Sequence, residues 1–177
     1  MRKFFDMKIA EHEVSLPIFR VSDDISIAAF ILFDYPELTM NAAAELIEKC
    51  PYFDVIVTPE AKSIPLAYEM SRQCGKPYIV VRKAKKLYMS DVLETTVKSI
   101  TTLNTQKLFL SGNDVPKLSN KKVLIVDDVI STGESLNAVR ELVESADGNV
   151  CGVAAVLAEG DAAKRTDIVY LEKLPLF

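Results

Sequence analysis

The sequence has little of what many catalytic and metal centres are built from. It contains a single histidine, His12, and no tryptophan among 177 residues. One histidine excludes a histidine-rich zinc site, and a Ser-His-Asp triad is possible only if His12 belongs to it. The three cysteines, Cys50, Cys74 and Cys151, are odd in number and show no CxxC spacing. This pattern is typical of reduced thiols in a cytosolic protein.

Basic charge and long apolar runs are also scarce. The net charge is -4 at pH 7, which argues against a protein that binds nucleic acid through bulk charge. No apolar run reaches the length of a membrane span, and acidic residues follow the first residues too soon for a signal peptide. We therefore expect a cytoplasmic protein without a nucleic-acid or membrane partner.

The six glycines lie far apart in the sequence. A Walker A loop and a GxGxxG motif both need closely spaced glycines, so that the backbone can approach a phosphate. Their lack excludes the P-loop triphosphatases and the dinucleotide-binding proteins. The composition, 49% hydrophobic and 26% charged, is that of an ordinary globular protein, and the length fits one domain. Evidence for function must therefore come from local motifs.

The first fifty residues lead to three expectations. Residues 1–12 are predicted to form a short helix with an apolar side. The nearly continuous apolar run at 25–33 is typical of a strand or a buried hairpin arm. Thr39 is expected to cap a helix that ends at Cys50, since a proline follows.

From Asp54 onward, predicted strands and helices alternate. The expected strands cover residues 54–58, 76–81, 123–126 and 150–157, and the expected helices cover residues 63–74 and 134–145. Two further strands, at 95–100 and 106–110, are predicted to form a hairpin around Asn104. Strands separated by helices indicate a parallel sheet. Ligands of such sheets bind at the carboxyl ends of the strands.

The most informative stretch runs from Val123 to Ser135 and reads VLIVDDVISTGES. Four apolar residues form a buried strand, Asp127 and Asp128 follow at its end, and a Ser-Thr-Gly turn opens a helix. Small residues at a helix N-terminus offer N–H and O–H donors to a phosphate, and the helix dipole helps. The two carboxylates would repel a phosphate, but they can accept hydrogen bonds from vicinal hydroxyls. A ribose 5-phosphate satisfies both halves of the motif.

This stretch resembles the signature with which type I phosphoribosyltransferases bind phosphoribosyl pyrophosphate (PRPP). In that family the positions of Asp127 and Asp128 hold the ribose hydroxyls, so the resemblance assigns both to catalysis. The family's next loop surrounds the 5-phosphate, and its counterparts here are Ser131, Thr132, Gly133, Glu134 and Ser135. Glu134 falls at a tolerant position, where its side chain can point outward.

Two further segments are similar to the purine branch of the family. The loop that contacts pyrophosphate follows an earlier strand, and its counterparts here are Pro59, Glu60, Ala61 and Lys62. Ser63 stands where glycine is common. The run RKAKKLY at 82–88 is similar to the RK-x-x-K-L run of adenine and xanthine phosphoribosyltransferases. The cations that this resemblance assigns to the pyrophosphate are Arg82, Lys85 and Lys86.

A fourth segment resembles the adenine enzymes in particular. They carry a glutamate near the base in a context similar to Ser-Asp-Val-Leu-Glu at 90–94, and this resemblance makes Glu94 a catalytic candidate that handles a proton. Base selection in the family belongs to a hood at the edge of the sheet. The hood candidates here are Phe33, Tyr35 and Glu159, whereas His12 is expected at a surface or an interface.

The resemblance implies an α/β fold, with a parallel sheet flanked by helices and a mobile β-hairpin loop. It implies one domain over 1–177, with a core at about 39–158 and a hood from 1–38 and 159–177. The implied reaction transfers phosphoribose from PRPP to a purine base, adenine first and xanthine or hypoxanthine next. Mg2+ would bind mainly through PRPP, with no protein ligand assigned, and the protein would be a homodimer.

Two alternatives stay open. One is a regulator of the same fold that binds PRPP or a nucleotide without catalysis. The other is another enzyme of the superfamily, such as an orotate enzyme, although the Arg-Lys run followed by Lys-Leu favours the purine branch.

Overall fold

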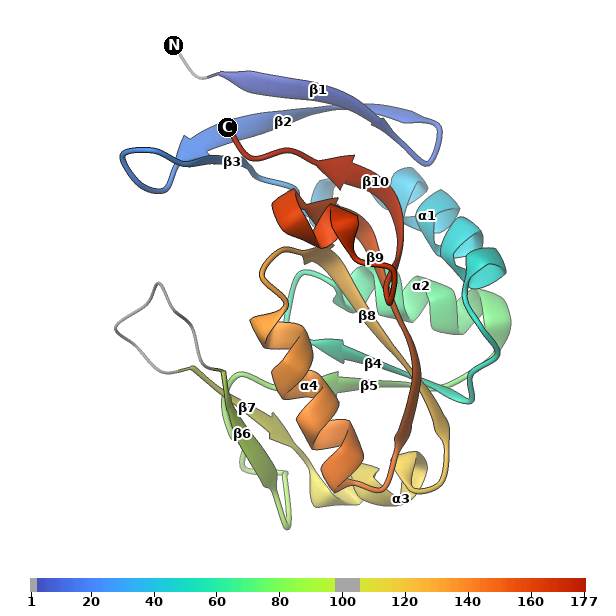
Figure 1. Cartoon of the computed structure of the whole chain (residues 1–177). Helices are drawn as coiled ribbons and strands as arrows, with labels where there is room; N and C mark the ends of the chain where they lie inside the picture. The colour runs from blue at the N-terminus through green and yellow to red at the C-terminus, as the bar shows by residue number, and fades with distance from the viewer. Residues whose placement is uncertain (1–2, 98–105) are drawn as a thin grey trace.

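A computed structural model describes residues 3–97 and 106–177 (Figure 1). Its strands are β1 (Phe4–Ile9), β2 (His12–Arg20), β3 (Ser26–Ala28), β4 (Val55–Pro59), β5 (Tyr78–Val81), β6 (Leu93–Val97), β7 (Gln106–Leu110), β8 (Lys122–Ile130), β9 (Asn149–Glu159) and β10 (Val169–Leu174). Its α-helices are α1 (Pro36–Lys49), α2 (Ile64–Cys74), α3 (Val115–Leu118) and α4 (Glu134–Ser145). Short 3-10 turns cover Leu32–Asp34, Gly112–Asp114 and Gly160–Lys164.

The centre of the fold is a five-stranded sheet in the order β10-β9-β8-β4-β5. Every neighbouring pair in it is parallel. Side chains of β8 alternate between its faces: Leu124 and Val126 pack with α1 and α2, and Val123 and Ile125 pack with α4. Helices therefore cover both faces (Figure 1), and the predicted parallel α/β fold is confirmed.

The strand and helix units in the middle of the chain form for local reasons. Every residue of β4 is buried, as expected for a central strand in a parallel sheet. Helix α2 ends at Gly75, whose φ of 70° is left-handed and favours glycine. Helix α4 covers the predicted residues 134–145. No helix in the described part of the chain is long and apolar enough to cross a membrane.

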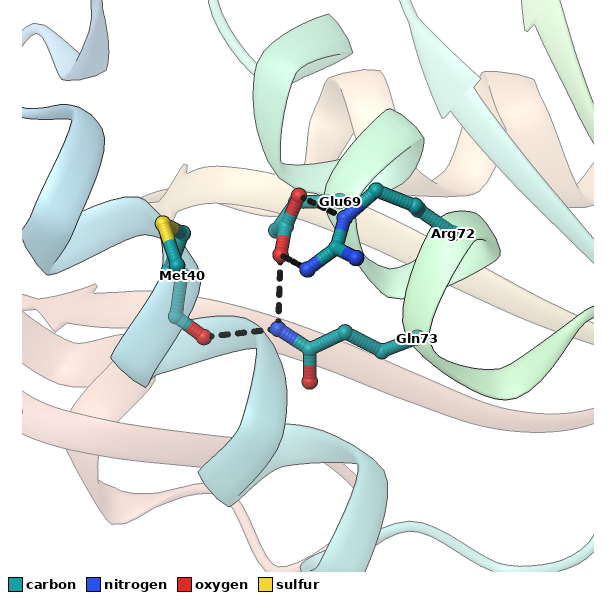
Figure 2. A network of polar contacts seen from close by, with 4 residues as sticks. All are labelled: Met40, Glu69, Arg72 and Gln73. Atoms are coloured by element: carbon teal, nitrogen blue, oxygen red, sulfur yellow. Dashed lines mark hydrogen bonds and ion pairs between the residues drawn. The ribbon is translucent and has the colours of Figure 1, made fainter.

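A polar network around the buried Glu69 side chain joins α1 to α2 (Figure 2). Glu69 accepts hydrogen bonds from Arg72 Nε at 2.9 Å and Nη2 at 2.7 Å. Gln73 Nε2 donates to Glu69 Oε1 at 2.8 Å and to the Met40 carbonyl oxygen of α1 at 2.9 Å. Because the Glu69 side chain is only 9% exposed, these bonds satisfy a carboxylate that burial would otherwise destabilise.

The N-terminal segment differs from the prediction. Residues 1–12 were predicted to be helical, but β1, β2 and β3 form a separate antiparallel sheet. Along β1 the burial alternates with period two, because Phe5, Met7 and Ile9 face inward. The two turn residues Ala10 and Glu11 both have positive φ, 45° and 68°, as a tight hairpin turn requires.

The boundaries of the next elements also differ. The run 25–33 forms only the short strand β3, followed by the 3-10 turn at Leu32–Asp34. Helix α1 begins at Pro36 and not after Thr39, because proline is favoured in the first helical turn. Thr39 lies inside the helix, where its hydroxyl donates to the Tyr35 carbonyl oxygen at 2.7 Å.

The C-terminal segment has two structural roles. Strand β10 pairs with β9 at the edge of the central sheet, a strand that the sequence patterns did not indicate. Phe177 then reaches the N-terminal sheet, where its backbone exchanges two hydrogen bonds with Ser26 at 2.6 and 2.9 Å. The end of the chain thus lies beside β2 and β3 (Figure 1).

Candidate active site

The site lies at the carboxyl ends of β4 and β8, as parallel-sheet topology predicts. Pairing between these strands stops at Val57 and Ile125, while β8 continues beside β9 as far as Ile130. The predicted strand end at Val126 was therefore too early, because pairing with β9 extends the strand. Asp127 and Asp128 lie inside β8, in the part of the strand that no longer pairs with β4.

One pocket collects residues from five parts of the chain. Its lining consists of Pro59, Glu60, Ala61, Lys62 and Ser63 after β4, Asp127, Asp128 and Val129 on β8, Lys83 after β5, Gln106 and Leu108 on β7, and Ser135 on α4. An adjoining hollow is lined by Asp127, Val129, Ile130, Ser131, Thr132, Gly133, Ser135 and Leu136. Because the two share Asp127, Val129 and Ser135, the structure brings the predicted carboxylates and both predicted loops together.

The two carboxylates have different surroundings. Asp128 is buried, with a side chain 4% exposed, and its Oδ2 lies 2.7 Å from Lys62 Nζ. This cation compensates a carboxylate that has lost its hydration. Asp127 Oδ1 accepts a hydrogen bond from the Asp128 backbone N–H at 2.9 Å. Burial and the neighbouring Asp128 carboxylate raise the pKa of Asp127.

Hydrogen bonds close the loop after β4. The Thr58 hydroxyl donates to Ser63 Oγ at 2.8 Å, and the Ser63 hydroxyl donates to the Pro59 carbonyl oxygen at 3.0 Å. The Glu60 N–H donates to the Val81 carbonyl oxygen at 2.8 Å, and the Glu60–Ala61 peptide is cis. Ser63, which replaces the glycine common in the family, therefore fixes this loop through its side chain.

Glu60 links this loop to the start of the basic run. Its Oε2 accepts a hydrogen bond from the Lys83 backbone N–H at 3.0 Å, and its Oε1 lies 3.3 Å from Arg82 Nη2. The Arg82 backbone in turn exchanges two hydrogen bonds with Phe109 of β7, at 2.9 and 2.8 Å. The Glu60 side chain thus holds the base of the hairpin, and the negative charge that it brings to the loop is paired.

The turn before α4 has the form of a phosphate-binding loop. Gly133 has a left-handed φ of 83° and directly precedes the helix. The left-handed φ favours glycine here, and a Cβ atom at this position would lie 2.6 Å from Arg165 Nη1 and displace that side chain. Glu134 is the first residue of α4, a 12-residue helix whose N-terminus is directed at the hollow.

Some predicted residues do not line the pocket in this structure. Glu94 lies on β6 and forms an exposed ion pair with Lys107 across the hairpin, at 2.7 Å. Arg82, Lys85 and Lys86 are also absent from the lining residues, although Lys83 of the same segment is among them. The hairpin itself is confirmed, with β6 antiparallel to β7. Asn104, at its predicted turn, lies outside the described residues.

Two lining residues were not singled out from the sequence. Lys83 belongs to the basic run, so its neighbours Arg82 and Lys85 already pointed to this segment. Gln106 lies at the start of β7, and only its place in the hairpin register brings it to the pocket. No sequence signal distinguishes Gln106 from other exposed polar residues.

The histidine and the cysteines do not line the pocket. His12 begins β2, and its Nε2 lies 3.0 Å from Asn41 Nδ2 of α1. Cys50, Cys74 and Cys151 are free, and burial raises the pKa of the Cys50 thiol to about 12. Such a thiol stays protonated and unreactive at neutral pH.

The predicted base-selecting residues lie on three separate elements. Phe33 belongs to the 3-10 turn before α1 and is 58% exposed. Tyr35 packs partly against the core, and Glu159 ends β9. None of the three lines the pocket that holds the carboxylates.

The carboxylates of the site are too few to hold a metal ion without ligands from a substrate or water. Among the described residues, no three or more His, Cys, Asp or Glu side chains are grouped as metal ligands would be. Asp127 and Asp128 offer hard oxygen donors of the kind that Mg2+ prefers, but the remaining ligands would have to come from a substrate or water. The residues present therefore fit Mg2+ that arrives as a phosphate complex.

A doubly covered parallel sheet with a phosphate-type loop beside two carboxylates defines a class of phosphoribosyl-binding proteins. Residues 36–173 match the family described as phosphoribosyl transferase domain, and the chain belongs to this family. Two similar proteins are hypoxanthine/guanine phosphoribosyltransferases. The one from Methanothermobacter thermautotrophicus is 32% identical over 130 residues, which cover 73% of this chain and 64% of that protein. The one from Methanotorris igneus is 30% identical over 131 residues, covering 73% and 68%.

Solved structures share the fold. Adenine phosphoribosyltransferase from Thermoanaerobacter pseudethanolicus superposes with a TM-score of 0.72 at 22% identity, covering 97% of this chain and 95% of that one. The enzyme from Saccharomyces cerevisiae gives a TM-score of 0.70 at 21% identity, covering 96% and 92%. At these identities the likeness establishes the fold, including the N-terminal sheet that lies outside the family match.

Proposed function

We propose that this protein transfers phosphoribose from PRPP to a purine base, giving a nucleoside monophosphate and pyrophosphate. The observation that carries the proposal is the continuous pocket formed by the Asp127–Asp128 pair, the loop before α4 and the Lys62 loop. The carboxylate pair matches the ribose of PRPP, the loop before α4 matches its 5-phosphate, and the cation Lys62 matches its pyrophosphate.

Each part of the pocket then has a task. Backbone N–H groups and hydroxyls of the segment 131–135 hold the 5-phosphate, and Asp127 and Asp128 accept hydrogen bonds from the ribose hydroxyls. Lys62 lies on the pyrophosphate side, and Arg82, Lys85 and Lys86 join it through movement of the basic segment. Mg2+, bound mainly through PRPP, supplies positive charge to the pyrophosphate.

In the reaction, the bond from ribose C1 to a pyrophosphate oxygen breaks, and the electron pair leaves with the pyrophosphate. A purine nitrogen forms the new bond to C1 and loses its proton, for which Glu94 is the proposed acceptor. Positive charge develops on the ribose beside the two carboxylates, while the leaving group gains negative charge near the cations. Fixed charges at both ends therefore stabilise the transition state.

Different observations support two classes of purine base as the substrate. The adenine-like context of Glu94 supports adenine, the base favoured by the sequence motifs. The sequence relatives are named for hypoxanthine and guanine, which supports a 6-oxopurine instead. Phe33, Tyr35 and Glu159 are the proposed selecting residues: the two rings would stack on the purine, and the Glu159 carboxylate accepts a hydrogen bond from a 6-amino group but not from a 6-oxo oxygen.

The direct test is to incubate the protein with PRPP and Mg2+ and each of adenine, hypoxanthine, guanine and xanthine separately. We expect pyrophosphate release with one of them, and the preferred base gives the highest kcat/KM. Tight PRPP binding without turnover on any base would contradict the enzyme and favour a regulator of the same fold. Turnover with orotate would move the protein out of the purine branch.

A homodimer is also part of the proposal. The basic run carries Leu87 and Tyr88 fully or largely exposed, and apolar side chains of this size in an exposed segment suit contact with a second copy. Light scattering on a size-exclusion column is expected to give twice the mass of the 19.6 kDa chain. A monomer at micromolar concentration would contradict this part.

A further inference from the structure

Arg165 lies against the loop before α4, although the two are far apart in the sequence. It follows the 3-10 turn at Gly160–Lys164, in the connection between β9 and β10. A Cβ added to Gly133 would lie 2.6 Å from Arg165 Nη1 and 3.9 Å from Arg165 Cζ, the only near atoms from a described part of the chain distant in sequence. The guanidinium is therefore the group that closes the space beside the glycine.

An acidic partner fixes the orientation of this guanidinium. Arg165 Nε donates to Asp167 Oδ1 at 2.9 Å, and Nη2 donates to Asp167 Oδ2 at 2.7 Å. Two parallel bonds hold a guanidinium plane far better than one. Because the carboxylate occupies the Nε–Nη2 edge, Nη1 is the part that faces Gly133. The Arg165 side chain is 30% exposed, so water screens its charge only in part.

We infer that Arg165 is a positioning residue for the phosphate loop: it holds the turn at Gly133 and adds a fixed positive charge beside the bound phosphate. The inference rests on the proposed function, which places a sugar phosphate in this loop. A dianionic phosphate at a helix N-terminus is stabilised by any further positive charge held close by. Asp167 offsets part of this charge, but it lies on the opposite edge of the guanidinium, so Nη1 is the nearer group to the loop.

Binding of two partial substrates tests this role separately from catalysis. Ribose 5-phosphate probes the phosphate loop, and pyrophosphate with Mg2+ probes the Lys62 loop. We expect Arg165→Gln to weaken ribose 5-phosphate about threefold to fivefold, the effect of one partly screened charge. Pyrophosphate binding is expected to stay unchanged, and in turnover KM for PRPP should rise by a similar factor with kcat unchanged.

Lys164→Gln is the matched control. It removes the same charge one position earlier, from a side chain that is 82% exposed and paired with the exposed Asp161. Arg165→Lys keeps the charge but loses the two-bond fork, so ribose 5-phosphate affinity should fall between wild type and Arg165→Gln. This second variant also keeps the test decisive if Arg165→Gln melts early.

The outcomes separate the two levels of the proposal. A loss of affinity confined to ribose 5-phosphate and to the Arg165 variants supports the positioning role. A smaller affinity difference between wild type and these variants at high salt supports it too. Equal losses in Lys164→Gln, or wild-type affinity in both Arg165 variants, would overturn it while leaving the proposed function intact. Wild-type protein that bound no ribose 5-phosphate would overturn the proposed function and this inference together.

Discussion

Asp127 and Asp128 are adjacent carboxylates on one strand, and only Asp128 has a cation at contact distance, Lys62 at 2.7 Å. Replacing both by asparagine keeps their size and removes both charges. We expect turnover to fall by roughly 10²-fold to 10³-fold or more, because groups aimed at developing charge carry effects of that order. Pyrophosphate release measures the loss, and an unchanged circular dichroism spectrum shows that the fold is intact. Activity within tenfold of wild type would mean that the ribose lies elsewhere.

The Asp127 carboxylate also has a cost in stability. The raised pKa of Asp127 means that the folded state holds its proton more tightly than the unfolded state does. Stability therefore falls as pH rises from the ordinary value near 3.9 through the raised one. We expect Asp127→Asn to melt higher than wild type at pH 8, by about 2–4 °C for each 1 kcal/mol relieved.

At pH 4 the melting advantage of Asp127→Asn should nearly vanish, since Asp127 is then largely protonated in the folded protein. A matched pair of thermal melts at the two pH values measures this difference. An advantage that is constant or larger in acid would contradict the assignment of the raised pKa to Asp127.

The site residues that could be predicted lie in contiguous motifs. The segment 123–135 contains the strand, the two carboxylates and the turn in one continuous run, so its role can be predicted from the sequence. Arg165 and Gln106 are different: Arg165 lies in the connection between β9 and β10 and Gln106 at the start of β7, and only the folding of the chain brings them near segment 123–135. The Glu60 side chain was assigned to the pyrophosphate by resemblance. Its contacts with Arg82 and Lys83 could not be predicted, because they join segments more than twenty residues apart.

At the scale of elements, the alternating strands and helices after Asp54 were predictable because each has its own local signals. The hairpin of β1 and β2 was missed for a physical reason. Phe4 and Phe5 are adjacent, so the apolar residues of 1–12 fit a helical side, whereas only Phe5 faces inward. The Ala10–Glu11 turn also lacks the Asn or Gly that usually marks such a hairpin.

Helices α1 and α2 meet through the Glu69 network (Figure 2). We expect Glu69→Gln to destabilise the protein by about 1–2 kcal/mol, because the buried position of Glu69 then loses a charge-assisted acceptor for Arg72 and Gln73. Chemical denaturation measures the change. The control is Glu45→Gln, which removes an exposed 3.5 Å ion pair with Lys49 and should cost less than about 0.5 kcal/mol.

The Glu69 network should also respond to pH. Hydrogen bonds from Arg72 lower the pKa of Glu69, so its contribution is present above the ordinary value near 4.3 and is lost as pH falls through the lowered one. The difference between wild type and Glu69→Gln should therefore shrink in acid. A gap that persists at pH 3 would show that packing, and not the ionised carboxylate, joins the two helices.

At the scale of the whole molecule, the C-terminal residue Phe177 packs against the N-terminal sheet of β1, β2 and β3. The Phe177 ring packs edge-on against Phe5, with centroids 5.1 Å apart, while its backbone pairs with Ser26. No contiguous motif carries this contact, which joins residues at opposite ends of the sequence. The N-terminal sheet thus depends on the C-terminal segment, which also supplies β10 and Arg165.

Phe177→Ala should therefore loosen the N-terminal sheet and leave the phosphate loop unchanged. An edge-on aromatic pair contributes about 0.5–1.5 kcal/mol, so we expect faster amide hydrogen exchange in β1–β3 and little change in α4. If this sheet helps to select the base, KM for the base rises while KM for PRPP does not. Phe4→Ala is the control, since Phe4 is 54% exposed on the other face of β1. Equal exchange in both variants would contradict the role of Phe177 in holding the sheet, and a rise confined to the KM for PRPP would separate the sheet from base binding.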